Sequence, residues 1–137
     1  MECTVHKLVA DVAVFAGDQV LLVRYQDTSD YDGQRGWFLP DDYLQHLEHP
    51  EAAAARILRE QAGLDDPPNV RLSHIESFDG GTWHLVFHYA ADVAEAAPVA
   101  AAGNVLAAEW FGLDSLPQKE DVAHHGWAID VLAAIER

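Results

Sequence analysis

The sequence predicts an α/β fold in which two helices accompany a mixed β-sheet. Three observations carry this prediction: two pairs of β-rich runs flank short glycine-containing turns, one helical segment separates those pairs, and a second helical segment ends the chain. The first connection is a short hairpin, which makes its two strands antiparallel. This favours a mixed sheet over an all-parallel one.

The first hairpin spans residues 8–25. Valine- and leucine-rich runs lie on either side of the turn at Gly17 and Asp18, the pattern expected of two paired strands. The acidic connection 26–36 follows, and we expect it to be a loop.

The first helix is predicted over residues 50–63. A short apolar run at 37–39 precedes it and ends at Pro40. Pro50 in the first turn, a run of alanines and a closing Gly63 are typical start and stop signals of a helix.

The second half of the chain predicts another hairpin, a long loop, a strand and a final helix. Residues 70–78 and 83–91 flank a Gly-Gly turn, residues 93–103 are alanine-rich, and residues 106–111 are typical of a strand. Residues 122–135 predict the last helix. Strict alternation in the 83–91 run places two sets of side chains on opposite faces: Trp83, Leu85, Phe87 and Tyr89 on one, and His84, Val86 and His88 on the other.

Composition narrows the possible partners and location. The chain has 137 residues, and we expect residues 1–137 to form a single domain. Its formal net charge of −15, with only two lysines, opposes binding to a nucleic-acid polymer. No run is apolar over the ~20 residues that cross a bilayer, and no secretory signal is visible, so we expect a cytoplasmic protein with no membrane partner. The single cysteine, Cys3, excludes an intramolecular disulfide.

One segment carries a family resemblance. Residues 37–64 read WFLPDDYLQHLEHPEAAAARILREQAGL. This resembles the box of the Nudix hydrolases, G-x5-E-x7-R-E-U-x-E-E-x-G-U, where U is a bulky apolar residue. Arg56 and Gly63 fix the register, which puts Glu48 at the first glutamate and Glu60 at the first of the paired glutamates. The runs 21–24 and 109–117 also resemble the family, so the resemblance covers nearly the whole chain.

The resemblance implies a Nudix-type α/β/α sandwich that holds Mg²⁺ or Mn²⁺ on a nucleoside diphosphate linked to another group. Four positions depart from the family pattern. Asp41 and Asp42 stand where glycines are usual, Ile57 replaces the glutamate after the arginine, and Gln61 replaces the second of the paired glutamates.

These departures weaken the expected metal site. At about 100° per residue, Ile57 lies between Glu60 and Gln61 on the helix, in the middle of the face that carries carboxylates in the family. We expect Glu60 to be the main metal ligand, with Glu48 and the uncharged oxygen of Gln61 as further ligands. Arg56 is expected to position the loop.

Each of these side chains also has a purely structural interpretation. Glu60 can be an exposed helix carboxylate that pairs with Arg56. Asp41 and Asp42 either compensate for the lost ligands or only mark a changed loop.

Histidines and tryptophans offer further candidates. His84 and His88 share a strand face, but their spacing separates the rings by about 13 Å, too far to bind one ion unaided. His46 and His49 flank Glu48, and the His124–His125 pair is expected to be surface. Three tryptophans are candidates for stacking on a base, although each also fits a core or sheet position: Trp37, Trp83 and Trp110.

Two functions follow. In the first, the protein is a metal-dependent hydrolase of a phosphorylated small molecule, with weak or altered activity and, as the resemblance implies, a homodimer. In the second, it is a non-catalytic Nudix-fold module that binds a small ligand or another protein. The loops 26–36 and 93–103 are expected to set specificity in either case.

Overall fold

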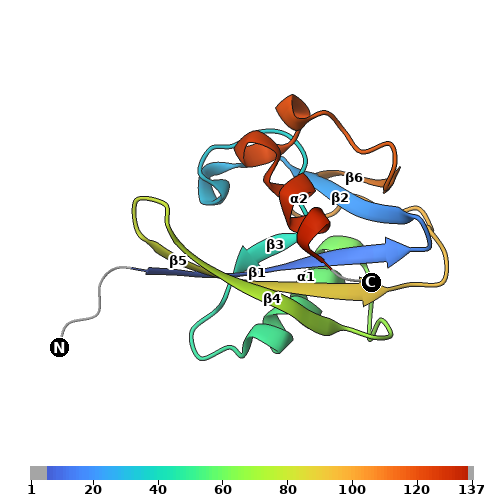
Figure 1. The fold of residues 1–137 in the computed structure, drawn as a ribbon. Helices are drawn as coiled ribbons and strands as arrows, with labels where there is room; N and C mark the ends of the chain where they lie inside the picture. The colour runs from blue at the N-terminus through green and yellow to red at the C-terminus, as the bar shows by residue number, and fades with distance from the viewer. Residues whose placement is uncertain (1–5, 136–137) are drawn as a thin grey trace.

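The computed structural model describes residues 6–135, which form a six-stranded mixed sheet with one helix on each face (Figure 1). Cys3 lies outside the described residues. The strands are β1 (His6–Ala16), β2 (Gln19–Tyr25), β3 (Asp41–Tyr43), β4 (Arg71–Asp79), β5 (Trp83–Asp92) and β6 (Val105–Gly112). The helices are α1 (Pro50–Ala62) and α2 (Ala123–Ala134), with 3-10 turns η1 (Ser29–Tyr31) and η2 (Lys119–Asp121). None of the helices in this part of the chain is long and apolar enough to span a membrane.

The predicted α/β class and mixed sheet are confirmed. The path order is β4-β5-β1-β2-β6, in which β1 and β5 are parallel and the other neighbours are antiparallel. Both hairpins, the strand after them and the irregular 93–103 segment lie where the sequence predicts them.

Two apolar layers hold the helices against the sheet. Alternate residues of β1 face opposite sides, so Val12 and Val14 pack with α1 while Ala13 and Phe15 pack with α2. Because both faces are covered, the central strand is apolar along most of its length.

Helix α1 begins and ends at the predicted signals. The His49 Nδ1 atom accepts a hydrogen bond from the backbone N–H of Glu51 at 3.0 Å, and Pro50 follows as the first helical residue. Gly63 has a φ of +65° and its N–H donates to the Leu58 carbonyl, which closes the last turn. His49 therefore has a capping role, and His46 is exposed in the preceding loop.

The segment after Pro40 differs from the prediction, because Asp41–Tyr43 is a strand rather than a loop. After the hairpin tip, β1 and β2 separate, and residues 38–43 fill the space between them. Phe38 bridges to Val23 of β2, and β3 pairs with residues 9–11 of β1. This places the two aspartates on a fixed strand beside α1.

The last helix also differs from the prediction. His124, His125 and Gly126 have left-handed backbone angles, so regular helix begins only after Gly126. His125 is exposed as expected. His124 is half-buried, because the left-handed turn directs it toward Phe38, 6.2 Å away between ring centroids.

Candidate functional site

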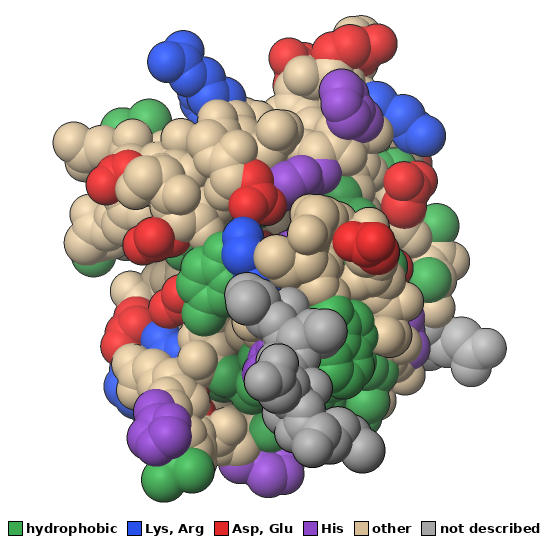
Figure 2. Space-filling model, turned by 90° about the vertical axis from the view of Figure 1, so that its left-hand side faces the viewer, with side chains coloured by type: hydrophobic (Ala, Val, Ile, Leu, Met, Phe, Trp, Pro, Cys, Tyr) green, Lys and Arg blue, Asp and Glu red, His purple; other side chains and the backbone are tan. Residues whose placement is uncertain are grey.

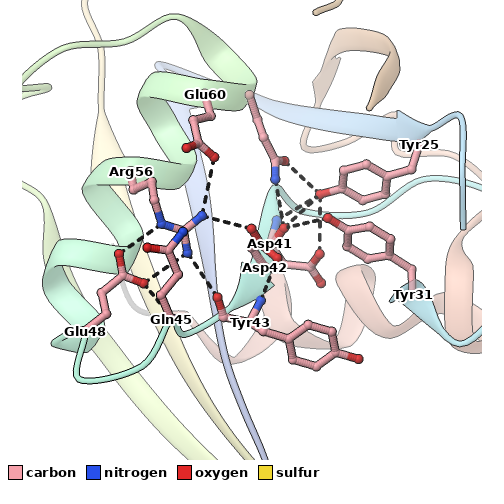
Figure 3. A network of polar contacts seen from close by, with 10 residues as sticks. Tyr25, Tyr31, Asp41, Asp42, Tyr43, Gln45, Glu48, Arg56 and Glu60 are labelled. Atoms are coloured by element: carbon pink, nitrogen blue, oxygen red, sulfur yellow. Dashed lines mark hydrogen bonds and ion pairs between the residues drawn. The ribbon is translucent and has the colours of Figure 1, made fainter. Parts of the chain in front are cut away.

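Arg56, in the middle of α1, is the centre of a cluster of carboxylates (Figure 3). Its Nε and Nη2 atoms donate to the two oxygens of Glu48 at 2.9 and 3.0 Å, and Nη1 donates to Asp42 at 2.9 Å. Nη2 also donates to the Tyr43 carbonyl at 3.0 Å, and Glu60 lies 3.4 Å from Nη1. We call Arg56 with Glu48, Asp42 and Glu60 the Arg56 cluster.

The Arg56 cluster fixes the loop before α1 to the helix and to β3. Arg56 is only 7% exposed, so its charge depends on these partners. The hydrogen bonds from Arg56 hold the pKa of Glu48 below its ordinary value. The cluster unites Glu48, Arg56 and Glu60, which the sequence singled out as one site.

Ile57 faces the core of the protein. Its side chain has no exposed surface and belongs to the core between α1 and the sheet. The helix angles relating it to Glu60 and Gln61 hold, but the face that contains Ile57 packs on the sheet. Glu60 lies at the edge of that face, with 55% of its side chain exposed.

Gln61 is buried in a polar network with Tyr25, Tyr31 and Asp41, the three residues of the network that Figure 3 labels. Its Oε1 accepts from the Tyr25 hydroxyl at 2.8 Å, and its Nε2 donates to the Asp41 carbonyl at 2.8 Å. The Asp41 N–H donates back to the Tyr25 hydroxyl at 3.0 Å, and Tyr31 stacks on Tyr25. Both ends of the Gln61 amide thus have protein partners.

Asp41 is a buried carboxyl opposite a second one. It pairs with Asp11 across the β1–β3 ladder, and it is 5% exposed. Burial, and then the nearby Asp11 carboxylate, raise the pKa of Asp41 well above its ordinary value. The negative charge at this position is therefore a cost to the folded state at neutral pH.

This cost predicts a pH-dependent effect of Asp41→Asn. Because the folded-state pKa is raised, the folded protein holds a proton that the unfolded chain has lost, so this group destabilises the fold as the pH rises toward the raised value. We expect Asp41→Asn to increase the free energy of unfolding at pH 8 by roughly 1–3 kcal/mol. The gain should shrink as the pH falls toward 4.

Urea unfolding at several pH values measures this effect. The exposed Asp65→Asn is the matched control, which should change stability little at any pH. Equal gains for Asp41→Asn at pH 4 and pH 8 would contradict the assignment of a raised pKa.

A cavity of about 390 Å³ lies beside β3. Its wall comes from the η1 turn, β1, β3, the β4–β5 hairpin and the start of α2. Its ionisable and aromatic lining residues are Asp30, Tyr31, Asp32, Phe38, Asp41, Asp42, Tyr43, Glu76, Phe78, His84, His124 and Trp127. Asp42 belongs to both the cavity wall and the Arg56 cluster, so the two features adjoin.

The cavity wall is acidic and aromatic. No lysine or arginine of the described chain lines it. At its rim, Asp32 pairs with Lys7 at 3.3 Å, and it lies 3.4 Å from His124 Nε2. Burial lowers the pKa of His124, which favours its neutral form. Figure 2 shows acidic and histidine side chains beside hydrophobic ones on the end of the molecule that carries the η1 turn and the β4–β5 hairpin.

Trp127 is the tryptophan of the cavity, and the sequence prediction missed it. Trp37 packs edge-on against Phe111, Trp83 donates to Ser77, and Trp110 donates to the Ala97 carbonyl. One feature of the sequence could have identified Trp127: it directly follows Gly126. The left-handed turn that ends at Gly126 places the first residue of the regular helix in the cavity wall. The 26–36 loop contributes three lining residues; the 93–103 loop contributes none.

His84 does not belong to the group of potential metal ligands that contains His88, but His88 has another histidine beside it. Its ring lies 4.5 Å from that of His74 on the neighbouring strand β4. The sequence gives no direct sign of this pair, because the contact depends on the cross-strand register.

The chain belongs to the NUDIX domain family, whose model matches residues 5–131. Its fold is similar to that of a MutT NUDIX hydrolase from Burkholderia pseudomallei, at 21% identity and a TM-score of 0.71 over 91% of this chain and 96% of that one. It is also similar to the NUDIX domain of Shewanella oneidensis NrtR in complex with ADP ribose, at 20% identity and 0.69 over 94% and 87%.

A MutT/nudix family protein from Enterococcus faecalis is similar at 22% identity and a TM-score of 0.69, and the match covers 82% of this chain but only 46% of that one. The chain thus spans about half the length of that relative. No curated protein matches the sequence.

Proposed function

We propose that the protein is a Nudix-type hydrolase that splits a phosphoanhydride in a small phosphorylated molecule, such as a nucleoside diphosphate linked to a second group, and that it does so slowly. The observation that carries this proposal is the position of Asp42, whose carboxylate contacts Arg56 and also lines the cavity. A ligand in the cavity would therefore lie next to the carboxylates that match the family's box.

The Arg56 cluster fits a hard divalent cation. Three carboxylates around one guanidinium leave two net negative charges, and an oxygen-only set of donors is what Mg²⁺ and Mn²⁺ prefer. We propose Glu60 and Glu48 as ligands, with Asp42 as a replacement for a lost one. Gln61 would join them only by giving up its hydrogen bond from Tyr25.

A bound divalent ion would supply charge neutralisation at the phosphates and an activated water. Arg56 would hold the loop and its carboxylates in place. The rings of Tyr31, Phe38 and Trp127 offer apolar faces for a planar group of the ligand. The ADP ribose held by the similar domain of NrtR supports a ligand of this size and class. With an apolar side chain at Ile57, the site has less charge than the family pattern provides, which is why we expect slow turnover.

The second candidate function is a non-catalytic module that binds a small ligand in the same cavity. Two observations favour it: Ile57 is part of the core, and both ends of the Gln61 amide are bonded. Helix α1 then offers a single carboxylate, Glu60, at the family's three ligand positions.

A comparison of substrate turnover by the unsubstituted protein and by Glu60→Gln distinguishes the hydrolase from the binding module. The protein would be incubated with Mg²⁺ or Mn²⁺ and a panel of nucleoside diphosphate sugars, dinucleoside polyphosphates and modified nucleoside triphosphates, with phosphate release measured after phosphatase treatment. We expect weak turnover of at least one compound, and a further loss of about 10- to 100-fold in Glu60→Gln, the range seen when a metal site loses support.

Glu51→Gln is the matched control, because Glu51 is an exposed carboxylate on the first turn of the same helix. It should keep the activity of the unsubstituted protein. Absence of turnover over the whole panel, together with no shift of the melting temperature in millimolar Mg²⁺ or Mn²⁺, would refute the hydrolase and leave the binding module.

A further inference from the structure

Three potential metal ligands converge on the α2 face of the sheet. In the β4–β5 ladder His74 is paired with His88, and Glu76 follows His74 by two residues, so all three side chains lie on one face. One potential ligand atom from each lies within 4.8 Å of those of the other two. This spacing allows a single ion to bind all three. We call them the His74–Glu76–His88 cluster.

His88 is held in an orientation that suits a ligand. Its ring is fully buried, its Nδ1 lies 2.7 Å from Asp11 Oδ1, and its Nε2 lies 2.6 Å from Glu76 Oε1. Both contacts are hydrogen bonds to carboxylates, which accept when ionised, so Nδ1 and Nε2 both donate in this arrangement. Once Nε2 gives up its proton while Nδ1–H stays on Asp11, Nε2 is free to bind an ion together with Glu76. A carboxylate behind the ring is the usual partner of a histidine that binds a metal ion.

The negative charge around the cluster also favours the binding of a cation. Asp11 has no exposed surface, and its Oδ2 atom has no hydrogen-bond partner among the described residues. When both imidazoles are neutral and both carboxyl groups are ionised, Asp11 and Glu76 carry two negative charges, which one divalent ion would balance. A proton on His88 balances only one of them.

We propose that His74, Glu76 and His88 bind a divalent transition-metal ion, with Zn²⁺ as the best match, and that Asp11 orients His88. Two imidazoles and one carboxylate suit ions of intermediate softness better than Mg²⁺, and they leave a coordination position open. Glu76 also lines the cavity, so the ion would lie in the cavity wall. This site is separate from the Arg56 cluster and does not depend on hydrolase activity.

Metal titration of chelator-treated protein tests the site. We expect one Zn²⁺ per chain by calorimetry, a rise in melting temperature on adding Zn²⁺, and visible Co²⁺ bands typical of a four- or five-coordinate ion. His74→Gln and Glu76→Gln should each weaken Zn²⁺ affinity by at least about tenfold, and Asp11→Asn should do the same without removing a ligand. Glu76 is partly exposed, so its variant tests the site even if a buried substitution unfolds the protein.

His84→Gln is the control for the strand face, because His84 lies on the same side of β5 but outside the cluster. Its Zn²⁺ affinity and Co²⁺ spectrum should be unchanged. Absence of stoichiometric Zn²⁺ binding, or equal affinity in the unsubstituted protein and both ligand variants, would overturn the proposal. Loss of Zn²⁺ binding in Glu60→Gln alone would also overturn it, since the ion would then bind at the Arg56 cluster.

Discussion

Arg56→Ala is expected to lower the free energy of unfolding by about 3–5 kcal/mol, the cost of removing one partner from a buried ion pair. Arg56 is 7% exposed, and its guanidinium donates to Glu48, Asp42 and the Tyr43 carbonyl. Without it, two carboxylates and one carbonyl lose their partner together. Urea unfolding monitored by tryptophan fluorescence measures the change.

Two comparisons show whether this loss comes from the Arg56 cluster. Arg59→Ala, on the exposed side of the same helix, should change stability by less than about 0.5 kcal/mol. Arg56→Lys should lose an intermediate amount of stability, because an ammonium group keeps the positive charge but cannot form the paired hydrogen bonds to Glu48. A loss of less than 1 kcal/mol in Arg56→Ala would mean that the cluster contributes little to stability.

The Arg56 effect has a defined pH dependence. Because the pKa of Glu48 is lowered in the folded state, the stabilisation from this pair is present above the ordinary glutamate pKa and is lost as the pH falls through the lowered value. The difference between Arg56→Ala and the unsubstituted protein should therefore narrow in acid.

Gly36→Ala is expected to destabilise the protein by about 3 kcal/mol or more, from two sources. The residue has a φ of +106°, where a side chain is strained. An added Cβ would also lie 2.6 Å from the Asp121 carbonyl oxygen, which cannot withdraw because it accepts the Trp37 N–H at 2.9 Å. Thermal and urea unfolding measure the cost.

Gly33→Ala is the matched control. Gly33 also has a positive φ, of +65°, but an added Cβ would have open space around it. Its cost should be about 1–2 kcal/mol, which is the backbone strain alone. Equal free energies of unfolding for the two variants would mean that the close approach of Gly36 to the Asp121 backbone does not add to the cost of a side chain there.

Local signals in the sequence were enough to predict both hairpins and α1. Pro50 and Gly63 act within one or two turns of their own positions, so no tertiary information is needed to place the ends of that helix. Strand β3 is different. Two aspartates and a tyrosine have little intrinsic preference for a strand. They form one because they supply hydrogen-bond partners to an edge of β1 that β2 leaves unpaired.

The site was harder to predict than the fold for a geometric reason. Helix angles relate Ile57, Glu60 and Gln61 to each other, but they do not say which of the three faces the sheet. His74 and His88 are neighbours only because the β4–β5 register, which is irregular at Leu72–His74, brings them together. Sequence spacing cannot supply that register.

The parallel pairing of β1 with β5 has a consequence for how the chain folds. The first hairpin is joined by a short ladder at its tip, whereas β1 and β5 are paired along ten residues, and partners such as Asp11 and His88 are 77 positions apart. The central strand of the sheet therefore gains its main neighbour only after a long loop has closed. The chain loses the conformational entropy of this loop before the contacts between β1 and β5 can stabilise the fold. A nascent chain that ended before residue 83 would expose one edge of β1, a surface open to wrong partners until β5 is synthesised.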